Sequence, residues 1–181
     1  MQEVILVETV DEHGRATGEL EKLAAHRAPG TLHRAFSLFA FDAEGRMLLQ
    51  RRAAGKYHSP LLLTNTACGH PFPGEPPAEA ARRRAAEELG GPVTGLVELG
   101  VVRYHVHDER SGLDEHEYNH VFAGRVDGAL LDPDPAEIDE LRFVTAVELE
   151  RLRAREPFTA WFEDVYRTAA PRLAEWGFGA A

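Results

Sequence analysis

Short apolar runs separated by turn residues fill the first third of the chain. Runs of this kind, rich in Leu, Phe, Val and Thr, are typical of β-strands. A polar turn at residues 11–14 follows the first run, and Asp42-Ala43-Glu44-Gly45 joins two runs as the arms of a hairpin. The strands predicted in this part are residues 3–8, 32–41, 46–52 and 60–67.

The spacing of apolar residues becomes helical in the middle of the chain and again near its end. Pro76-Pro77 opens a predicted helix over residues 78–89, and Gly90-Gly91-Pro92 ends it. The other predicted elements are the strands 97–107 and 116–126 and the helices 146–155 and 159–170, the last of which carries Trp161. This order predicts an α/β fold of the α+β kind, in which a mixed sheet lies between helices.

Composition narrows the class of protein. A length of 181 residues with 44% hydrophobic residues is typical of one globular domain, residues 1–181, with N-terminal and C-terminal elaborations. A net charge of −10 argues against binding to nucleic acid or to an anionic membrane. We expect a cytoplasmic protein, because there is no long apolar run, no basic N-terminal segment and only one cysteine, Cys68.

The predicted central helix resembles the Nudix signature, a set of glycine, glutamate and arginine residues at fixed intervals. The matching positions are Gly69, Glu75, Arg83, Ala85, Glu87, Glu88 and Gly90. The one departure is Arg84, which stands where the signature has a glutamate. An ordinary amphipathic helix rich in Ala, Arg and Glu is the alternative, and the match at every other interval weighs against it.

In Nudix hydrolases the acidic residues of this helix hold divalent cations that activate water against a pyrophosphate. With arginine at position 84 the helix has one carboxylate ligand fewer for these cations. The Arg84 guanidinium can instead donate two parallel hydrogen bonds to phosphate oxygens. The resemblance therefore implies a Nudix fold whose helix binds a diphosphate without hydrolysing it.

Four other segments resemble hallmark segments of the type I isopentenyl-diphosphate isomerases: residues 23–26, 32–37, 64–71 and 115–117. The resemblance extends from the Glu21 region to Trp161. It implies an enzyme of isoprenoid precursor biosynthesis that converts isopentenyl diphosphate, a small molecule, to dimethylallyl diphosphate. Two alternatives stay open: a Nudix pyrophosphohydrolase acting on a nucleotide or other diphosphate, and a diphosphate-binding protein without catalytic activity.

Moving an unactivated double bond requires protonation of one carbon and deprotonation of another, through a tertiary carbocation. The resemblance implies that Cys68 and Glu117 carry out these transfers on opposite faces of the allylic unit. It also implies that Tyr104 forms a hydrogen bond near Glu117 and that the Trp161 ring faces the cation. Such a cation–π contact contributes about 2 kcal/mol when it is desolvated.

The resemblance further implies two metal sites. The expected ligands of one Mn²⁺ or Zn²⁺ ion are His26, His33, His70, Glu115 and Glu117. Glu88 would bind Mg²⁺ together with the substrate diphosphate. The expected diphosphate-binding residues are Lys22, Arg52, Lys56 and Arg84.

The other histidines have no assigned chemistry. We interpret them as surface or packing residues, with His116 pointing away from its neighbours: His13, His58, His105, His107 and His120. Leu61 and Leu63 stand where the family usually has glycine and tryptophan, which indicates either repacking beneath the pocket or an altered prenyl pocket. We expect a monomer or a weak homodimer.

Overall fold

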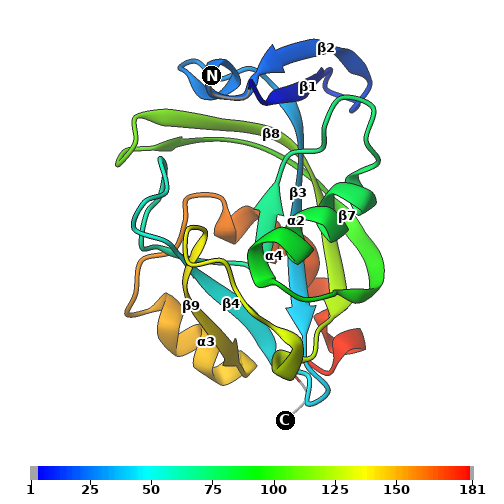
Figure 1. Ribbon diagram of the computed structural model, residues 1–181, viewed down its shortest axis with the longest axis vertical. Coiled ribbons are helices and arrows are strands. Elements are labelled where there is room, and N and C mark those ends of the chain that lie inside the picture. The colour runs from blue at the N-terminus through cyan, green and yellow to red at the C-terminus, as the bar shows by residue number, and fades with distance from the viewer. Residues whose placement is uncertain (1–3, 180–181) are drawn as a thin grey trace.

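The central strand β3 (His33–Phe41) organises the fold in the computed structural model, which describes residues 4–179 (Figure 1). It pairs in parallel with β8 (Leu113–Arg125) and antiparallel with β6 (Ala67–Gly69). The strand β7 (Thr94–Asp108) pairs antiparallel with β8, and the two form a long curved hairpin in Figure 1. The sheet is therefore mixed, as the order of elements in the sequence predicts.

Shorter strands extend this sheet at both ends of β3. Near the N-terminus, β1 (Leu6–Val10) and β2 (Ala16–Glu21) form a hairpin whose first strand touches the start of β3. At the other end, β4 (Met47–Arg52) pairs with β5 (Leu63–Thr64) and with β9 (Ile138–Val144).

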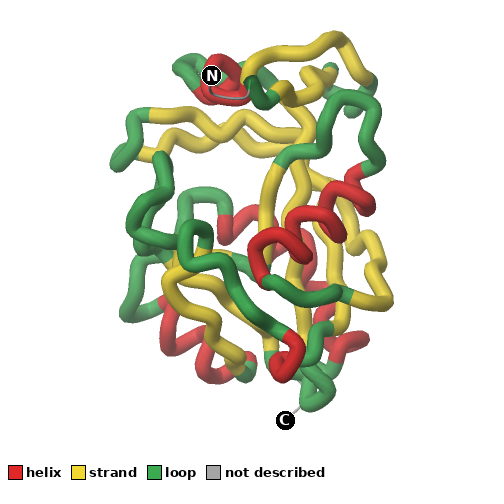
Figure 2. Tube along the Cα trace, in the orientation of Figure 1, coloured by secondary structure: helices red, strands yellow, loops and turns green. Residues whose placement is uncertain are grey.

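The alternation of side chains along β3 creates two hydrophobic cores, one on each face of the sheet. Phe36 and Leu38 lie in a core with the central helix α2 (Pro77–Leu89), whereas Phe39 lies in a core with α4 (Phe162–Ala169). The helix α3 (Ala146–Arg153) and the 3-10 segment η2 (Ala170–Trp176) contribute to the second core (Figure 2). This is the predicted sheet between helices.

Local chemistry explains where the helices begin and end. Pro77 is the first residue of α2, and Gly90 ends it with a φ of +66°. A side chain at Gly90 would lie 1.9 Å from the carbonyl oxygen of Asp132, so only glycine fits there. Thr145 and Glu148 form a capping box that starts α3.

Several predicted boundaries are wrong. The run 60–67 is not one strand, because Leu61 takes a φ of +61° and the chain bends between β5 and β6. Trp161 lies just before α4 as its N-cap residue instead of within the helix. The sequence pattern missed the elements α1 (Lys22–His26), β2, β9, η2 and the short 3-10 turn η1 (Gly128–Leu130). The first strand begins at Leu6, and the predicted residue Glu3 lies outside the described residues.

No helix within residues 4–179 combines the length and the apolar character needed to cross a lipid bilayer.

Candidate functional site

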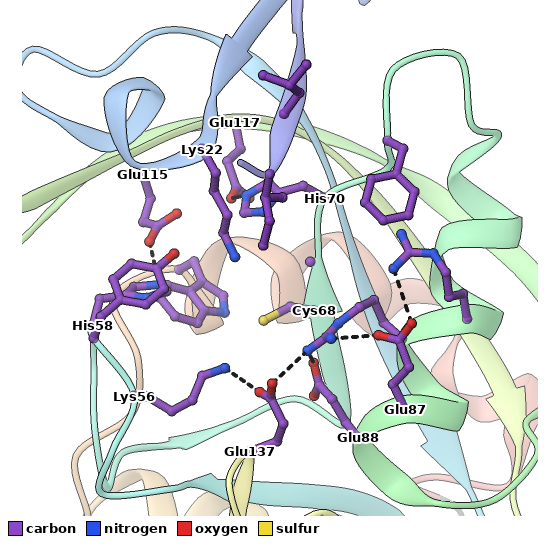
Figure 3. Close-up of a pocket in the computed structure, with 18 of the residues that line it drawn as sticks. Lys22, Lys56, His58, Cys68, His70, Glu87, Glu88, Glu115, Glu117 and Glu137 are labelled. Carbon is purple, nitrogen blue, oxygen red and sulfur yellow. Dashed lines mark hydrogen bonds and ion pairs between the residues drawn. The ribbon is translucent and has the colours of Figure 1, made fainter. Parts of the chain in front are cut away.

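A cavity of about 670 Å³ opens where α1, α2, β6 and the β7–β8 hairpin approach one another (Figure 3). Its volume is in the usual range for a site that holds a small molecule. The residues predicted for the site that line it are Lys22, Arg52, Lys56, Cys68, His70, Arg84, Glu88, Tyr104, Glu115, Glu117 and Trp161. His26 and His33 are not among the lining residues, and both are fully buried.

Four of the expected metal ligands converge at one end of this cavity. One ligand atom each from His26, His33, His70 and Glu117 lies within 4.8 Å of the others. These residues come from α1, β3, the end of β6 and β8, which are far apart in the sequence. The fold therefore assembles the group from four separate segments.

The hydrogen bonds of two of these imidazoles prepare them to bind a cation. The Nδ1 atom of His26 lies 2.7 Å from the carbonyl oxygen of Lys22, and that of His33 lies 2.7 Å from the carbonyl oxygen of Thr31. Each Nδ1–H donates to its carbonyl, which leaves the lone pair on Nε2 free. Both Nε2 atoms are buried and have no hydrogen-bond partner, so this donor set fits a divalent cation.

Burial keeps the imidazoles of His33 and His70 neutral, which is the form that binds metals, whereas the Glu115 carboxylate outweighs burial at His26 and raises its pKa. Burial lowers the pKa of His33 to about 4. Burial likewise lowers the pKa of His70 well below its ordinary value, and the neighbouring His33 adds to this effect.

Glu115 lies beside this group rather than within it. Its Oε2 is 3.2 Å from Nε2 of His26, and its Oε1 is 2.7 Å from Nε2 of His58. Both approaches are ion-pair contacts, and neither Nε2 of His26 nor Oε1 of Glu115 has a hydrogen-bond partner. Although burial opposes it, these two imidazoles hold the pKa of Glu115 well below its ordinary value.

Glu117 is the other buried carboxylate. It accepts hydrogen bonds from the Tyr104 hydroxyl and from Nδ2 of Asn119, and Tyr104 lies directly opposite it in the β7–β8 pair. Burial and the negative charge of Glu115 raise the pKa of Glu117 to about 8. In the protein without metal, this carboxyl group is thus able to exchange a proton near neutral pH.

Cys68 lies on the same face of the sheet as Glu117. Cys68 is opposite Ser37 and Glu117 is opposite His33, and these two positions of β3 differ by an even number of residues. Burial raises the pKa of the Cys68 thiol to about 12, so the thiol is protonated at neutral pH. Two exchangeable protons therefore face one cavity.

The opposite side of the cavity is basic. Lys56 pairs with Glu137, and Arg84 pairs with Glu88 and lies 3.4 Å from Glu137. Lys22 reaches toward this side from α1, the helix that also carries His26; burial lowers the pKa of Lys22, and the positive charge of Lys56 adds to this effect. These cations surround a space that suits a diphosphate.

Arg52 and Trp161 close the cavity near β5. The Arg52 guanidinium lies 5.5 Å from the centre of the Trp161 ring, and the ring itself is buried. Trp161 also lines the cavity.

Several residues of the cavity were not predicted from the sequence, and His58 and Glu137 are among those that contact predicted site residues. We interpreted His58 as a surface or packing residue, but it is 8% exposed and contacts Glu115. Burial lowers the pKa of His58, so this imidazole is neutral. Glu137 had no assigned role, and its loop gives no pattern that marks it as the partner of Lys56.

The other unassigned histidines lie outside the cavity. His105 and His107 are half-exposed and contact Asp114, and His120 contacts Glu98. The side chain of His116 points to the carbonyl oxygen of Gly30, away from the metal ligands, as predicted.

Leu61 and Leu63 do not line the cavity. Leu63 is fully buried, whereas Leu61 is 46% exposed. Their positions support the interpretation that the chain is repacked beneath the pocket.

Comparison with known proteins agrees with this geometry. The model of the NUDIX domain family matches residues 31–167. Isopentenyl-diphosphate Delta-isomerase of Streptomyces griseus is 56% identical over 173 residues, which cover 96% of this chain and 87% of the relative. The enzyme of that name from Halorhodospira halophila is 40% identical over 181 residues, which cover 99% and 100%.

Solved structures share the fold at lower identity. A crystal structure of a Deinococcus radiodurans protein superposes with a TM-score of 0.70 at 22% identity, and the match covers 90% of this chain and 98% of that chain. A similarity at this level of identity establishes the fold alone.

Proposed function

Because this chain belongs to the Nudix domain family and, within it, to the isopentenyl-diphosphate Delta-isomerases, we propose that it converts isopentenyl diphosphate to dimethylallyl diphosphate. The observation that carries this proposal is that Cys68 and Glu117 lie on one face of the sheet and both line the cavity. The other side of the same cavity carries arginine and lysine side chains. A protonated thiol and a titratable carboxyl group are the two groups that an allylic rearrangement needs.

The reaction transfers two protons and no other atoms. Addition of a proton to the terminal alkene carbon breaks the C=C π bond and leaves a tertiary cation. Loss of a proton from the carbon on the other side of the cation supplies the electron pair for the new double bond. One of Cys68 and Glu117 donates the first proton and the other accepts the second, while Tyr104 holds the Glu117 carboxyl group.

Trp161 faces the cationic intermediate in this proposal. Its indole ring is the best aromatic partner for a cation, and its burial excludes water that would otherwise capture the cation. The guanidinium of Arg52 rests on the same ring and fixes its orientation.

Lys22, Arg52, Lys56 and Arg84 would hold the diphosphate of the substrate. Glu137 pairs with Lys56 and lies 3.4 Å from Arg84, so one carboxylate positions two of these cations. A Mg²⁺ ion bound by Glu88 would neutralise part of the diphosphate charge.

The family uses divalent metals, and the residues that would hold the second ion are His26, His33, His70, Glu115 and Glu117. Three imidazoles and two carboxylates suit Mn²⁺ or Zn²⁺. An ion there would stabilise the Glu117 carboxylate and set its proton affinity.

Pyrophosphate hydrolysis is not favoured. Arg84 occupies the position of a signature glutamate, so this helix lacks one of the carboxylates with which Nudix hydrolases hold the cations that activate water. The positive charge of Arg84 opposes a second cation at this place.

A product analysis tests the proposed function against hydrolysis. Incubation with isopentenyl diphosphate and Mg²⁺ is expected to give dimethylallyl diphosphate by NMR, without release of phosphate from a panel of nucleoside diphosphates. Phosphate release that is undiminished in Cys68→Ala, with no rearranged product, would refute the proposal.

A further inference from the structure

His58 lies between the basic side of the cavity and the metal-ligand group (Figure 3). Its Nε2 is 2.7 Å from Oε1 of Glu115, and the Arg52 guanidinium contacts both its ring and its carbonyl oxygen. We propose that His58 is a positioning residue that holds the Glu115 carboxylate in place for the metal ion. This inference rests on the proposed function, since it concerns the same site.

The backbone around His58 is held in a strained and specific conformation. Ser59 and Leu61 take φ values of +47° and +61°, which non-glycine residues seldom adopt. The Ser59 amide and hydroxyl both donate to Oδ2 of Asp108, at 3.1 and 2.9 Å. These two contacts with Asp108 of β7 hold the turn in place, and the His58 ring lines the cavity.

The Arg52 guanidinium determines which tautomer of the His58 imidazole is present. This guanidinium donates to the His58 carbonyl oxygen at 3.2 and 3.3 Å, and Nη2 lies 3.4 Å from the ring Nδ1. An arginine cannot accept a hydrogen bond, so Nδ1 faces it as the acceptor and the proton is on Nε2. That N–H is the one that faces Glu115.

Packing holds the ring in the same place. The His58 ring centre is 5.4 Å from that of Trp161 and 4.7 Å from that of Tyr57. A phenyl ring at position 58 would preserve much of this packing but remove the polar contacts of the imidazole. His58→Phe therefore separates the contribution of packing from that of the polar contacts.

The position of Glu115 matters because its two oxygens have different neighbours. Oε2 faces His26, one of the expected metal ligands, and Oε1 faces His58. Outer polar partners of a metal ligand orient it, and their loss typically costs about 10- to 100-fold in metal affinity. His58 is such a partner of Glu115, through the ion-pair contact of 2.7 Å.

The test compares the Mn²⁺ affinity of four proteins by competition with a chelator: wild type, His58→Phe, His58→Gln and His58→Asn. A glutamine amide reaches the position of Nε2, whereas the shorter asparagine amide reaches only that of Nδ1. We expect His58→Phe and His58→Asn to bind Mn²⁺ about 10- to 100-fold more weakly. His58→Gln is expected to stay within about threefold of wild type, because it keeps a donor toward Glu115.

His120 provides a matched control. It also lies between an arginine and a glutamate, 3.2 Å from Nη1 of Arg34 and 2.8 Å from Oε1 of Glu98, but it does not line the cavity. His120→Phe should therefore leave Mn²⁺ affinity unchanged. Thermal unfolding without metal confirms that each variant is folded, and His58→Asn replaces His58→Phe if the latter does not fold.

Wild-type Mn²⁺ affinity in both His58→Phe and His58→Asn would overturn the inference. An equal loss in His58→Gln and His58→Asn would also overturn it, because it would show that only the imidazole ring matters. Since Mn²⁺ affinity is measured without substrate, these results are independent of isomerisation. A wild-type protein that binds Mn²⁺ but forms no dimethylallyl diphosphate would refute the proposed function alone.

Discussion

Single residues determine the chemistry of this cavity through burial and contacts with their neighbours. Burial keeps the Cys68 thiol protonated, and burial together with Glu115 raises the proton affinity of Glu117. Neither effect is a property of the residue type alone. Both depend on positions of the sheet that bring the two groups to one face.

Cys68→Ala and Glu117→Gln remove one proton-transfer group each with little change in volume. We expect each to lower the rate of isomerisation by at least about 10²-fold, since that is the lower range for losing a positioned acid or base. Steady-state kinetics with isopentenyl diphosphate measure the effect. His13→Ala, in an exposed turn, is the control and should keep the wild-type rate, whereas a wild-type rate in either test variant would contradict its role.

Many of the residues that line the cavity could be predicted from the sequence, but others could not. Cys68, Glu117 and the histidine ligands belong to segments with a recognisable order. The place of His58 depends on two residues with positive φ and on a contact with Asp108, 49 positions later. Sequence spacing contains no information about such a contact.

At the scale of elements, the segment between β4 and β5 carries His58 and a strained turn with positive φ at Ser59 and Leu61, and Leu63 begins β5 directly after it. The short strands were also the hardest to predict. Most of β2 is exposed, so it lacks the apolar alternation that marks a half-buried strand.

Leu61→Gly should relieve the strain of this turn. A leucine in the left-handed region costs about 1–2 kcal/mol, and glycine removes this cost. Glycine also loses more conformational entropy on folding, which reduces the gain in stability by about 0.5–1 kcal/mol. We expect the free energy of unfolding in urea to rise by up to about 1 kcal/mol. A loss of stability larger than about 1 kcal/mol would show that the conformation is not strained. Leu62→Gly, which empties a buried position without positive φ, should destabilise the protein.

Leu63→Trp tests whether residue 63 in β5 shapes the prenyl pocket or only packs in the core. Leu63 is fully buried and does not line the cavity, so the larger indole should overpack the core and lower the free energy of unfolding by about 1–3 kcal/mol. The KM for isopentenyl diphosphate and the preference among alkyl diphosphates should not change. A shift in either quantity would instead support an altered prenyl pocket.

At the scale of the whole molecule, the metal-ligand group joins segments that are far apart in the sequence. His26 lies on the short helix α1, whereas His33 and Glu117 lie on the paired core strands β3 and β8. A bound ion therefore ties the N-terminal region to the centre of the sheet. The layered core itself follows from the apolar pattern of β3 and α2, which is why the fold class could be predicted from the sequence.

Removal of metal should lower thermal stability as well as activity. An ion at 100 times its Kd stabilises the folded state by about 2.7 kcal/mol, which corresponds to about 5–10 °C in Tm for a chain of this size. Calorimetry of chelator-treated protein, before and after addition of Mn²⁺ or Zn²⁺, measures the difference. An unchanged Tm would mean that these residues bind no ion in the folded protein.

The most direct measurement is solvent-proton exchange at carbon. Isopentenyl diphosphate is incubated with the protein and Mg²⁺ in deuterated water, and the dimethylallyl diphosphate is analysed for deuterium. Protonation by a group that exchanges with water predicts deuterium in the product, and neither Cys68→Ala nor Glu117→Gln should accumulate labelled product at a comparable rate. Unlabelled product from the wild-type protein, or no product at all, would contradict proton transfer between this thiol and this carboxyl group.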